Sequence, residues 1–179
     1  IIDTPAHSHD VAAQCDHADG VVYVPALMGL GTPHWDFGAR GTMLGLTRGS
    51  GRPQVVRAVL EGVAHRGTDL LEAAEADYGE SIGAIRVDGG MSQNPTFIQA
   101  LANASGRAIE VSPQTEATTI GAAYLAGLAV GVWGSFDDIA EAWQPHVVVE
   151  PTERLDRQQW AGAIERARTW IPDLSALDF

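Results

Sequence analysis

Lysine is absent from this chain. All 11 basic residues are arginine, set against 23 acidic residues, and the net charge is −12. Because lysine is missing, the chain can form neither a lysine Schiff base nor the lysine-dependent phosphate loop of the Walker type. The acidic balance also argues against a basic face for nucleic acid, so no nucleic-acid partner is expected.

Cysteine and long apolar runs are scarce as well. Cys15 is the single cysteine, so no disulfide can form within the chain, which suits the reducing cytoplasm where we expect the protein to act. The longest apolar run, from Ile120 to Trp133, is shorter than the roughly 20 residues of a membrane-spanning helix, so no membrane partner is expected. The first residues lack the regions of a signal peptide and an initiator methionine, so we expect a piece of a longer gene product.

Potential metal ligands gather in the first 20 residues. They are His7, His9, Asp10, Cys15, Asp16 and His17. No pair among them has the spacing of a known zinc site, and the surrounding stretch is polar. We therefore expect a solvated helix or loop here and no metal site.

Hydrophobic residues make up 45% of the chain, which is enough for a packed core. Residues 21–24 form a β-type run that ends at Pro25. A Gly-rich loop follows from Met28 to Asp36. Such a loop either shapes a cleft or a domain contact, or is an ordinary ordered connection.

The longest predicted helix lies between Gly51 and Gly79. Its apolar residues recur at three- and four-residue steps, and we expect about 25 helical residues. His65 on this helix has no partner in the sequence that would tune its pKa, so we expect a packed or solvated histidine rather than a catalytic one.

A glycine turn is the centre of the pattern. The β-type run 85–87 leads through Asp88 to Gly89 and Gly90, and a helix signal follows at once, with Asn94 at the cap and a proline directly after it. Paired glycines between a strand and a helix let a flat or anionic ligand approach the backbone. The alternative is a purely structural turn in which Asn94 only caps its own helix.

Strand and helix signals alternate after this turn. The next β-type run, 107–111, completes a βαβ unit, for which parallel strands and a right-handed crossover are expected. A Gly/Ala-rich helix capped by Thr118 and Thr119 follows, then a short helix capped by Ser135 and a connection at 145–151. We predict one α/β unit over residues 1–179.

The chain ends in a predicted tail helix. Residues 152–179 form an amphipathic segment that we expect to pack on the α/β unit, with Leu155, Trp160, Ile164, Ala167 and Trp170 on one side.

Three motifs resemble those of the FGGY family of carbohydrate kinases. Residues 41–46, followed after seven residues by 54–61, look like the second signature of that family. Residues 87–91 with Asn94 resemble its adenine-nucleotide turn, and 120–131 resemble the helix that follows. The motifs stand in the family's order and cover about residues 21–170, which outweighs the purely structural alternative for the turn.

The resemblance implies a fold and a site. Members have two actin-like, ribonuclease H-like domains with a cleft between them, and this chain would be an N-terminally incomplete C-terminal domain. Gly89, Gly90 and Met91 would let adenine lie against the backbone, and Asn94 would hydrogen-bond its edge. ATP and Mg²⁺ are the implied cofactors. The general base and the metal-binding carboxylates would lie in the other domain, so no catalytic or metal-binding residue is assigned here.

Three functions are compatible with these observations. The first is an ATP-dependent kinase of a small polyol, because the loop from Gly29 to Asp36 resembles that branch of the family; Thr32, His34 and Phe37 depart from its commoner choices and leave other substrates open. The second is a related kinase of a pentulose. The third is a non-catalytic module with the acidic stretch 137–153 as a docking surface. The expected partners are the missing N-terminal domain, a small polyol or sugar, and further copies in a homo-oligomer.

Overall fold

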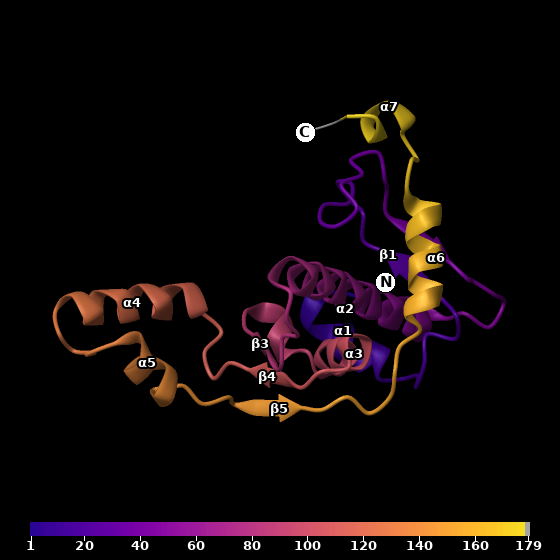
Figure 1. Ribbon diagram of the computed structural model, residues 1–179. Coiled ribbons are helices and arrows are strands. Elements are labelled where there is room, and N and C mark those ends of the chain that lie inside the picture. Colours follow the sequence, from indigo (N-terminus) through magenta and orange to yellow (C-terminus); the bar gives the residue numbers. More distant parts are fainter. Residues whose placement is uncertain (178–179) are drawn as a thin grey trace.

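The computed structural model describes residues 1–177, and a long helix lies at its centre (Figure 1). This helix, α2 (Arg52–Tyr78), has 27 residues and is roughly 40 Å long at the usual rise per residue. It ends at Gly79, whose φ of 81° is left-handed, as a helix-terminating glycine requires. The predicted helix is confirmed, and α1, α3 and β1 all pack against it.

The predicted βαβ unit is also confirmed. Strands β3 (Ile85–Val87) and β4 (Ile109–Val111) are parallel and are joined through helix α3 (Pro95–Ser105). The apolar side of α3 packs on α2 and on the sheet, with Ile98, Leu101 and Ile109 in one buried cluster. This packing fixes the position of the turn between β3 and α3.

A further strand, β5 (Val147–Val149), pairs antiparallel with β4, giving the order β3-β4-β5 in this sheet of the described chain. The expectation of a plain connection at 145–151 was therefore wrong. The strand has three residues between two prolines, too few for an alternating pattern, and it forms because the edge of β4 offers backbone partners.

A hairpin and the tail helix form a second packed region. Strands β1 (Val22–Val24) and β2 (Thr42–Leu44) pair antiparallel, and α6 (Arg157–Ala167) lies against them. Val24, Leu30, Trp160 and Ile164 are buried together in this region.

The predicted tail helix is shorter than expected. Asp156 precedes helix α6 as its N-cap, and its carboxylate accepts a hydrogen bond from the amide of Gln159 at 2.8 Å. A separate short helix, α7 (Pro172–Ser175), follows α6. Trp170 lies between the two helices with 73% of its surface exposed, so it is not on the packed side.

The N-terminal segment packs on the centre of the molecule. It forms η1 (Pro5–His7) and α1 (Ser8–Ala12), and Ser8, Val11 and Ala12 are buried. Val11 contacts the apolar cluster that includes Leu60 of α2. The expectation of a solvated segment was therefore wrong for α1, because a five-residue helix is too short to show its buried face as a period.

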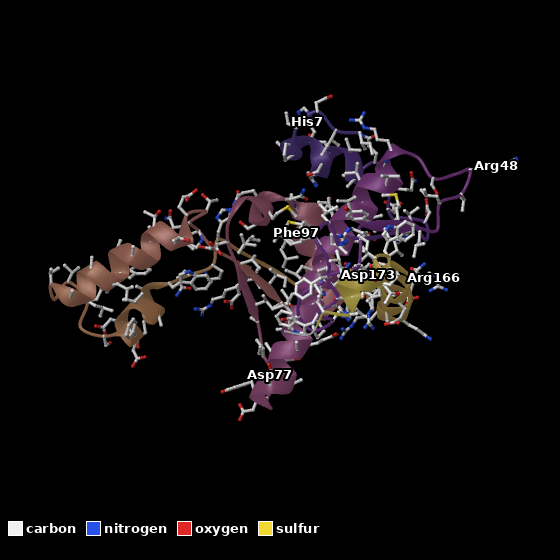
Figure 2. All side chains as sticks on the ribbon, turned by 90° about the horizontal axis from the view of Figure 1, so that it is seen from above. His7, Arg48, Asp77, Phe97, Arg166 and Asp173 are labelled. Carbon is white, nitrogen blue, oxygen red and sulfur yellow. The ribbon has the colours of Figure 1, made fainter. Side chains whose placement is uncertain are left out.

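Helices α4 (Ala117–Ala129) and α5 (Phe136–Ala142) project away from the rest of the chain (Figures 1 and 2). None of their described residues is buried. Ser135 caps α5 as predicted, through a 3.2 Å hydrogen bond from the amide of Asp138. Thr118 and Thr119 lie inside the first turn of α4 and do not cap it. No helix within residues 1–177 is both long and apolar enough to cross a bilayer.

Candidate functional site: a cavity at the glycine turn

A cavity of about 490 Å³ lies where the glycine turn meets the N-terminal segment. One side is formed by Gly90, Met91, Gln93 and Asn94, which belong to η2 (Gly90–Gln93) and the cap of α3. The other side is formed by residues 5, 6, 8 and 9 of η1 and α1. Small-molecule sites have volumes of roughly 300–1,000 Å³, so the cavity is large enough for one.

The two glycines of the turn have different roles. Gly89 has φ 83° and ψ −177°, a conformation that is essentially restricted to glycine, and it redirects the chain from β3 into η2. Gly90 has no such backbone restriction. Apart from its chain neighbours and the backbone of its own turn, no atom of residues 1–177 lies within 4 Å of the place where its Cβ would be. The absence of a side chain at Gly90 therefore leaves open space beside the cavity. Of the four predicted nucleotide residues, Gly90, Met91 and Asn94 line the cavity, and Gly89 shapes the turn.

Asn94 both caps α3 and contributes to the cavity. Its Oδ1 accepts a hydrogen bond from the amide of Phe97 at 3.1 Å, which confirms the predicted cap. Its Nδ2 donates to Oγ of Ser8 at 2.9 Å. Each of the two polar atoms has one further hydrogen-bonding position, so the amide can still offer one donor and one acceptor to a ligand.

Residues from α1 complete the site, and sequence reasoning missed them. Ser8 Oγ donates to the carbonyl of Pro5 at 2.6 Å, and Nδ1 of His9 lies 2.8 Å from Oγ1 of Thr96. Ser8 and Asn94 are 86 positions apart, and neither residue type indicates the other in a sequence. Only the packing of α1 on α2 and α3 brings them together.

The possible metal ligands of the first 20 residues do not form a centre. His9 is engaged with Thr96, and within residues 1–177 no group of three or more His, Cys, Asp or Glu side chains is arranged to hold a metal ion.

A separate buried cluster lies between α2 and α6, away from the glycine turn. His65 stacks on Trp160 with ring centroids 4.9 Å apart and 8° between the planes, so of the packed and solvated alternatives the structure shows the packed one. Burial, reinforced by the nearby charge of Arg157, lowers the pKa of His65 to about 4. Burial raises the pKa of Glu61, and the nearby Arg57 only partly offsets this. His65, Trp160 and Glu61 line a smaller cavity of about 180 Å³, and no residue of the glycine turn lines it.

The Gly-rich loop is fixed to the C-terminal segment through Asp36. The buried carboxylate of Asp36 accepts hydrogen bonds from Oγ of Ser175 at 2.6 Å and from the amides of Thr169 and Gly38 at 2.9 Å. Burial raises the pKa of Asp36, but these hydrogen bonds outweigh burial and hold that pKa below its ordinary value. The contacts make the loop an ordered connection, and they give Asp36 a structural task.

The α/β fold with its βαβ unit is that of the actin-like domain of sugar kinases. The model for the C-terminal domain of the FGGY family of carbohydrate kinases matches residues 4–130, and the chain belongs to this family.

Curated glycerol kinases are similar to this chain. The chain is 44% identical to glycerol kinase of Deinococcus radiodurans, covering 98% of this chain and 36% of that protein. It is 41% identical to glycerol kinase of Petrotoga mobilis, covering 97% of this chain and 36% of that protein. The chain therefore spans about a third of the length of these relatives.

Solved structures of sugar kinases are also similar to this chain. A crystal structure of Plasmodium falciparum glycerol kinase with ADP matches with a TM-score of 0.81 and 34% identity, over 93% of this chain and 34% of that one. A ligand-bound xylulose kinase from Lactobacillus acidophilus matches with a TM-score of 0.70 and 28% identity, over 92% of this chain and 32% of that one. The actin-like α/β fold predicted from the sequence is thereby confirmed.

Proposed function

We propose that this chain is the nucleotide-binding C-terminal part of an ATP-dependent glycerol kinase, which converts glycerol and ATP to glycerol 3-phosphate and ADP. The cavity at Gly90 and Asn94 carries the proposal, because it joins an open glycine backbone to an amide with a free donor and acceptor. The relatives that are named glycerol kinases support the choice of substrate.

The residues of the turn fit an adenine nucleotide. The missing side chain at Gly90 leaves room for a flat purine against the backbone. The amide of Asn94 suits the mixed donor and acceptor edge of adenine. ATP supplies the transferable phosphoryl group, and Mg²⁺ would neutralise its charge from ligands outside this chain. Phosphoryl transfer depends mostly on positioning and charge stabilisation, so the task of these residues is to hold the nucleotide in place.

The rest of the enzyme is the main proposed partner. The relatives are almost three times as long, and α4 and α5 bury none of their described residues within this chain. We propose that an N-terminal domain supplies the base and the metal ligands, and that the enzyme acts in the cytoplasm as a homo-oligomer. The free Cys15 is consistent with a reducing compartment.

The test is a comparison of substrates with the complete protein. ATP-dependent phosphorylation of glycerol, xylulose and ribulose is measured under the same conditions, and glycerol should have the highest kcat/KM. A higher value for a pentulose would replace glycerol in the proposal. The 179-residue chain alone should give no turnover, and absence of nucleotide binding by the complete protein would favour a non-catalytic module.

A further inference from the structure

The orientation of the Asn94 amide is fixed from two sides. The amide N–H of Phe97 can only donate, so the atom 3.1 Å away must be the oxygen of Asn94. The Ser8 hydroxyl uses its one hydrogen on the carbonyl of Pro5, so it can only accept from the nitrogen of Asn94. Both contacts therefore require the same placement of Oδ1 and Nδ2, although the two ends of an amide are nearly alike in shape.

The element that carries Ser8 is itself held in place. Ser8 is 9% exposed, and Val11 of the same helix is buried against α2. His9 adds a second side-chain contact to α3, through Thr96 at 2.8 Å. The hydroxyl of Ser8 is therefore a fixed acceptor beside the cavity.

A fixed amide can distinguish adenine from guanine. Adenine carries an amino donor at its C6 position, and guanine carries a carbonyl acceptor there. When a purine occupies one position in a cavity, its C6 group meets the same atom of the protein in both cases. If that atom is Oδ1 of Asn94, adenine donates to it, whereas guanine places two acceptors against each other and loses a hydrogen bond.

We propose that Ser8 is a positioning residue that favours adenine over guanine nucleotides by holding the Asn94 amide in this orientation. The inference rests on the proposed function, because it requires the nucleotide base to bind at the glycine turn. Ser8 itself acts through Asn94 and need not touch the nucleotide.

The experiment compares ATP with GTP as phosphoryl donors in the complete kinase. Ser8→Ala removes the acceptor, so the ratio of kcat/KM for ATP to that for GTP should fall about fivefold, in line with the worth of one neutral hydrogen bond. The change should lie in KM for the nucleotide, and kcat at saturating ATP should stay the same. Ser8→Thr keeps the hydroxyl and should restore the parental ratio.

A matched control is available on α3, the helix that Asn94 caps. Ser105 donates to the carbonyl of Leu101 at 2.7 Å at the far end of α3, so Ser105→Ala tests the loss of a serine hydroxyl without a change at the cavity. Its ATP to GTP ratio should equal that of the parent. If Ser8→Ala does not fold, Ser8→Cys provides a weak acceptor of similar size and should shift the ratio in the same direction.

Two failures are distinguishable. If Asn94→Ala leaves KM for ATP at the parental value, the base does not bind at this turn, and both the assigned site and the role of Ser8 are wrong. If Asn94→Ala raises KM for ATP but neither Ser8→Ala nor Ser8→Cys changes the ratio, the site stands and the role of Ser8 is wrong.

Discussion

Nη2 of Arg157 lies 2.7 Å from Oδ1 of Asp69, and this ion pair joins α6 to α2 across 88 positions of the sequence. Asp69 is 6% exposed and also accepts hydrogen bonds from the indole of Trp160 at 3.0 Å and from Arg66 at 2.8 Å. Three donors from two helices thus converge on one buried carboxylate. Because a buried charge is costly unless it is paired, the tail helix depends on this residue for its position.

Asp69→Asn should lower the free energy of unfolding by about 3 kcal/mol, because it removes the buried counter-charge of the partly buried guanidiniums of Arg66 and Arg157. Glu72→Gln is the control. The same Nη2 of Arg157 lies 2.7 Å from Glu72, but the side chain of Glu72 is 58% exposed, and surface ion pairs contribute little. Urea unfolding followed by tryptophan fluorescence measures both variants. If both variants lost the same free energy of unfolding, burial would not be what makes the contact of Arg157 with Asp69 more stabilising than its contact with Glu72.

The pH dependence of stability should carry a signature of His65. Nη1 of Arg157 lies 3.1 Å from Nδ1 of His65, and a guanidinium can only donate, so Nδ1 must be unprotonated and the imidazole neutral. The pKa of His65 is lowered from 6.5 to about 4 in the folded chain. Between these values the unfolded chain binds the proton and the folded chain does not, so stability falls as the pH drops from 6.5 toward 4.

The loss of unfolding free energy between pH 6.5 and 4 is about 3 kcal/mol. This value follows from the lowered pKa of His65 and from the free energy that corresponds to one pKa unit. His65→Phe keeps a ring to stack on Trp160 but cannot titrate. The difference in unfolding free energy between parent and His65→Phe, measured at pH values from 7 to 4, should therefore shrink or change sign in favour of the variant. If the unfolding free energies of the parent and of His65→Phe change with pH in parallel, His65 does not titrate in this range.

The close contact of α2 with β1 at Gly62 provides a test of the fold. A Cβ at Gly62 would lie 2.1 Å from the carbonyl oxygen of Tyr23 in β1, and backbone cannot yield easily. Gly62→Ala should therefore destabilise the chain by about 1–3 kcal/mol or more, as overpacking does. Gly67→Ala in the same helix would meet only the flexible end of Leu101 at 3.3 Å and gains helix propensity, so it should be near neutral. Thermal unfolding of both variants distinguishes the two positions.

The sequence predicted the parts of this fold that repeat a local pattern. Helix α2 was clear from its periodic apolar residues between two glycines, and the βαβ unit from the runs on either side of the glycine turn. The same reasoning could not find β5, because three valines between prolines do not establish a period. It could not find Ser8 either, since the contact of Ser8 with Asn94 follows from how α1 packs and from no property of the residues themselves. The sequence therefore predicted the side of the candidate site that the glycine turn forms. It did not predict the side formed by α1, which orients Asn94.

The arm formed by α4 and α5 should make the isolated chain self-associate. Leu125 is 59% exposed, Val130 78% and Phe136 69%, and exposed apolar clusters of this kind promote association. Leu125→Glu should reduce the associated fraction in sedimentation velocity runs. Leu46→Glu is the control, because Leu46 is similarly exposed, at 57%, but lies outside the arm. A monomeric parent chain without additives would contradict this prediction.

The last prediction concerns Gly90, where stability and binding can be separated. Apart from its chain neighbours and the backbone of its own turn, a Cβ at Gly90 has no atom of the described chain within 4 Å, and the φ of Gly90 is not in the left-handed region. Gly90→Val should therefore change the free energy of unfolding by no more than about 0.5 kcal/mol. The valine would nevertheless fill the space beside Met91 and Asn94 that a purine needs. In the complete kinase, KM for ATP should therefore rise at least about tenfold, a loss of 1.4 kcal/mol, with KM for glycerol unchanged.

Gly89→Ala is the matched variant for this test, because Gly89 precedes Gly90 in the turn but has the φ of 83° that a side chain makes unfavourable. It should cost about 1–3 kcal/mol of stability through backbone strain, whatever the cavity binds. A nucleotide site thus predicts that Gly90→Val loses ATP binding while remaining stable, and that Gly89→Ala loses stability. If Gly90→Val has the parental KM for ATP, the open space at this turn is not where the purine lies, and the assignment of the cavity is wrong.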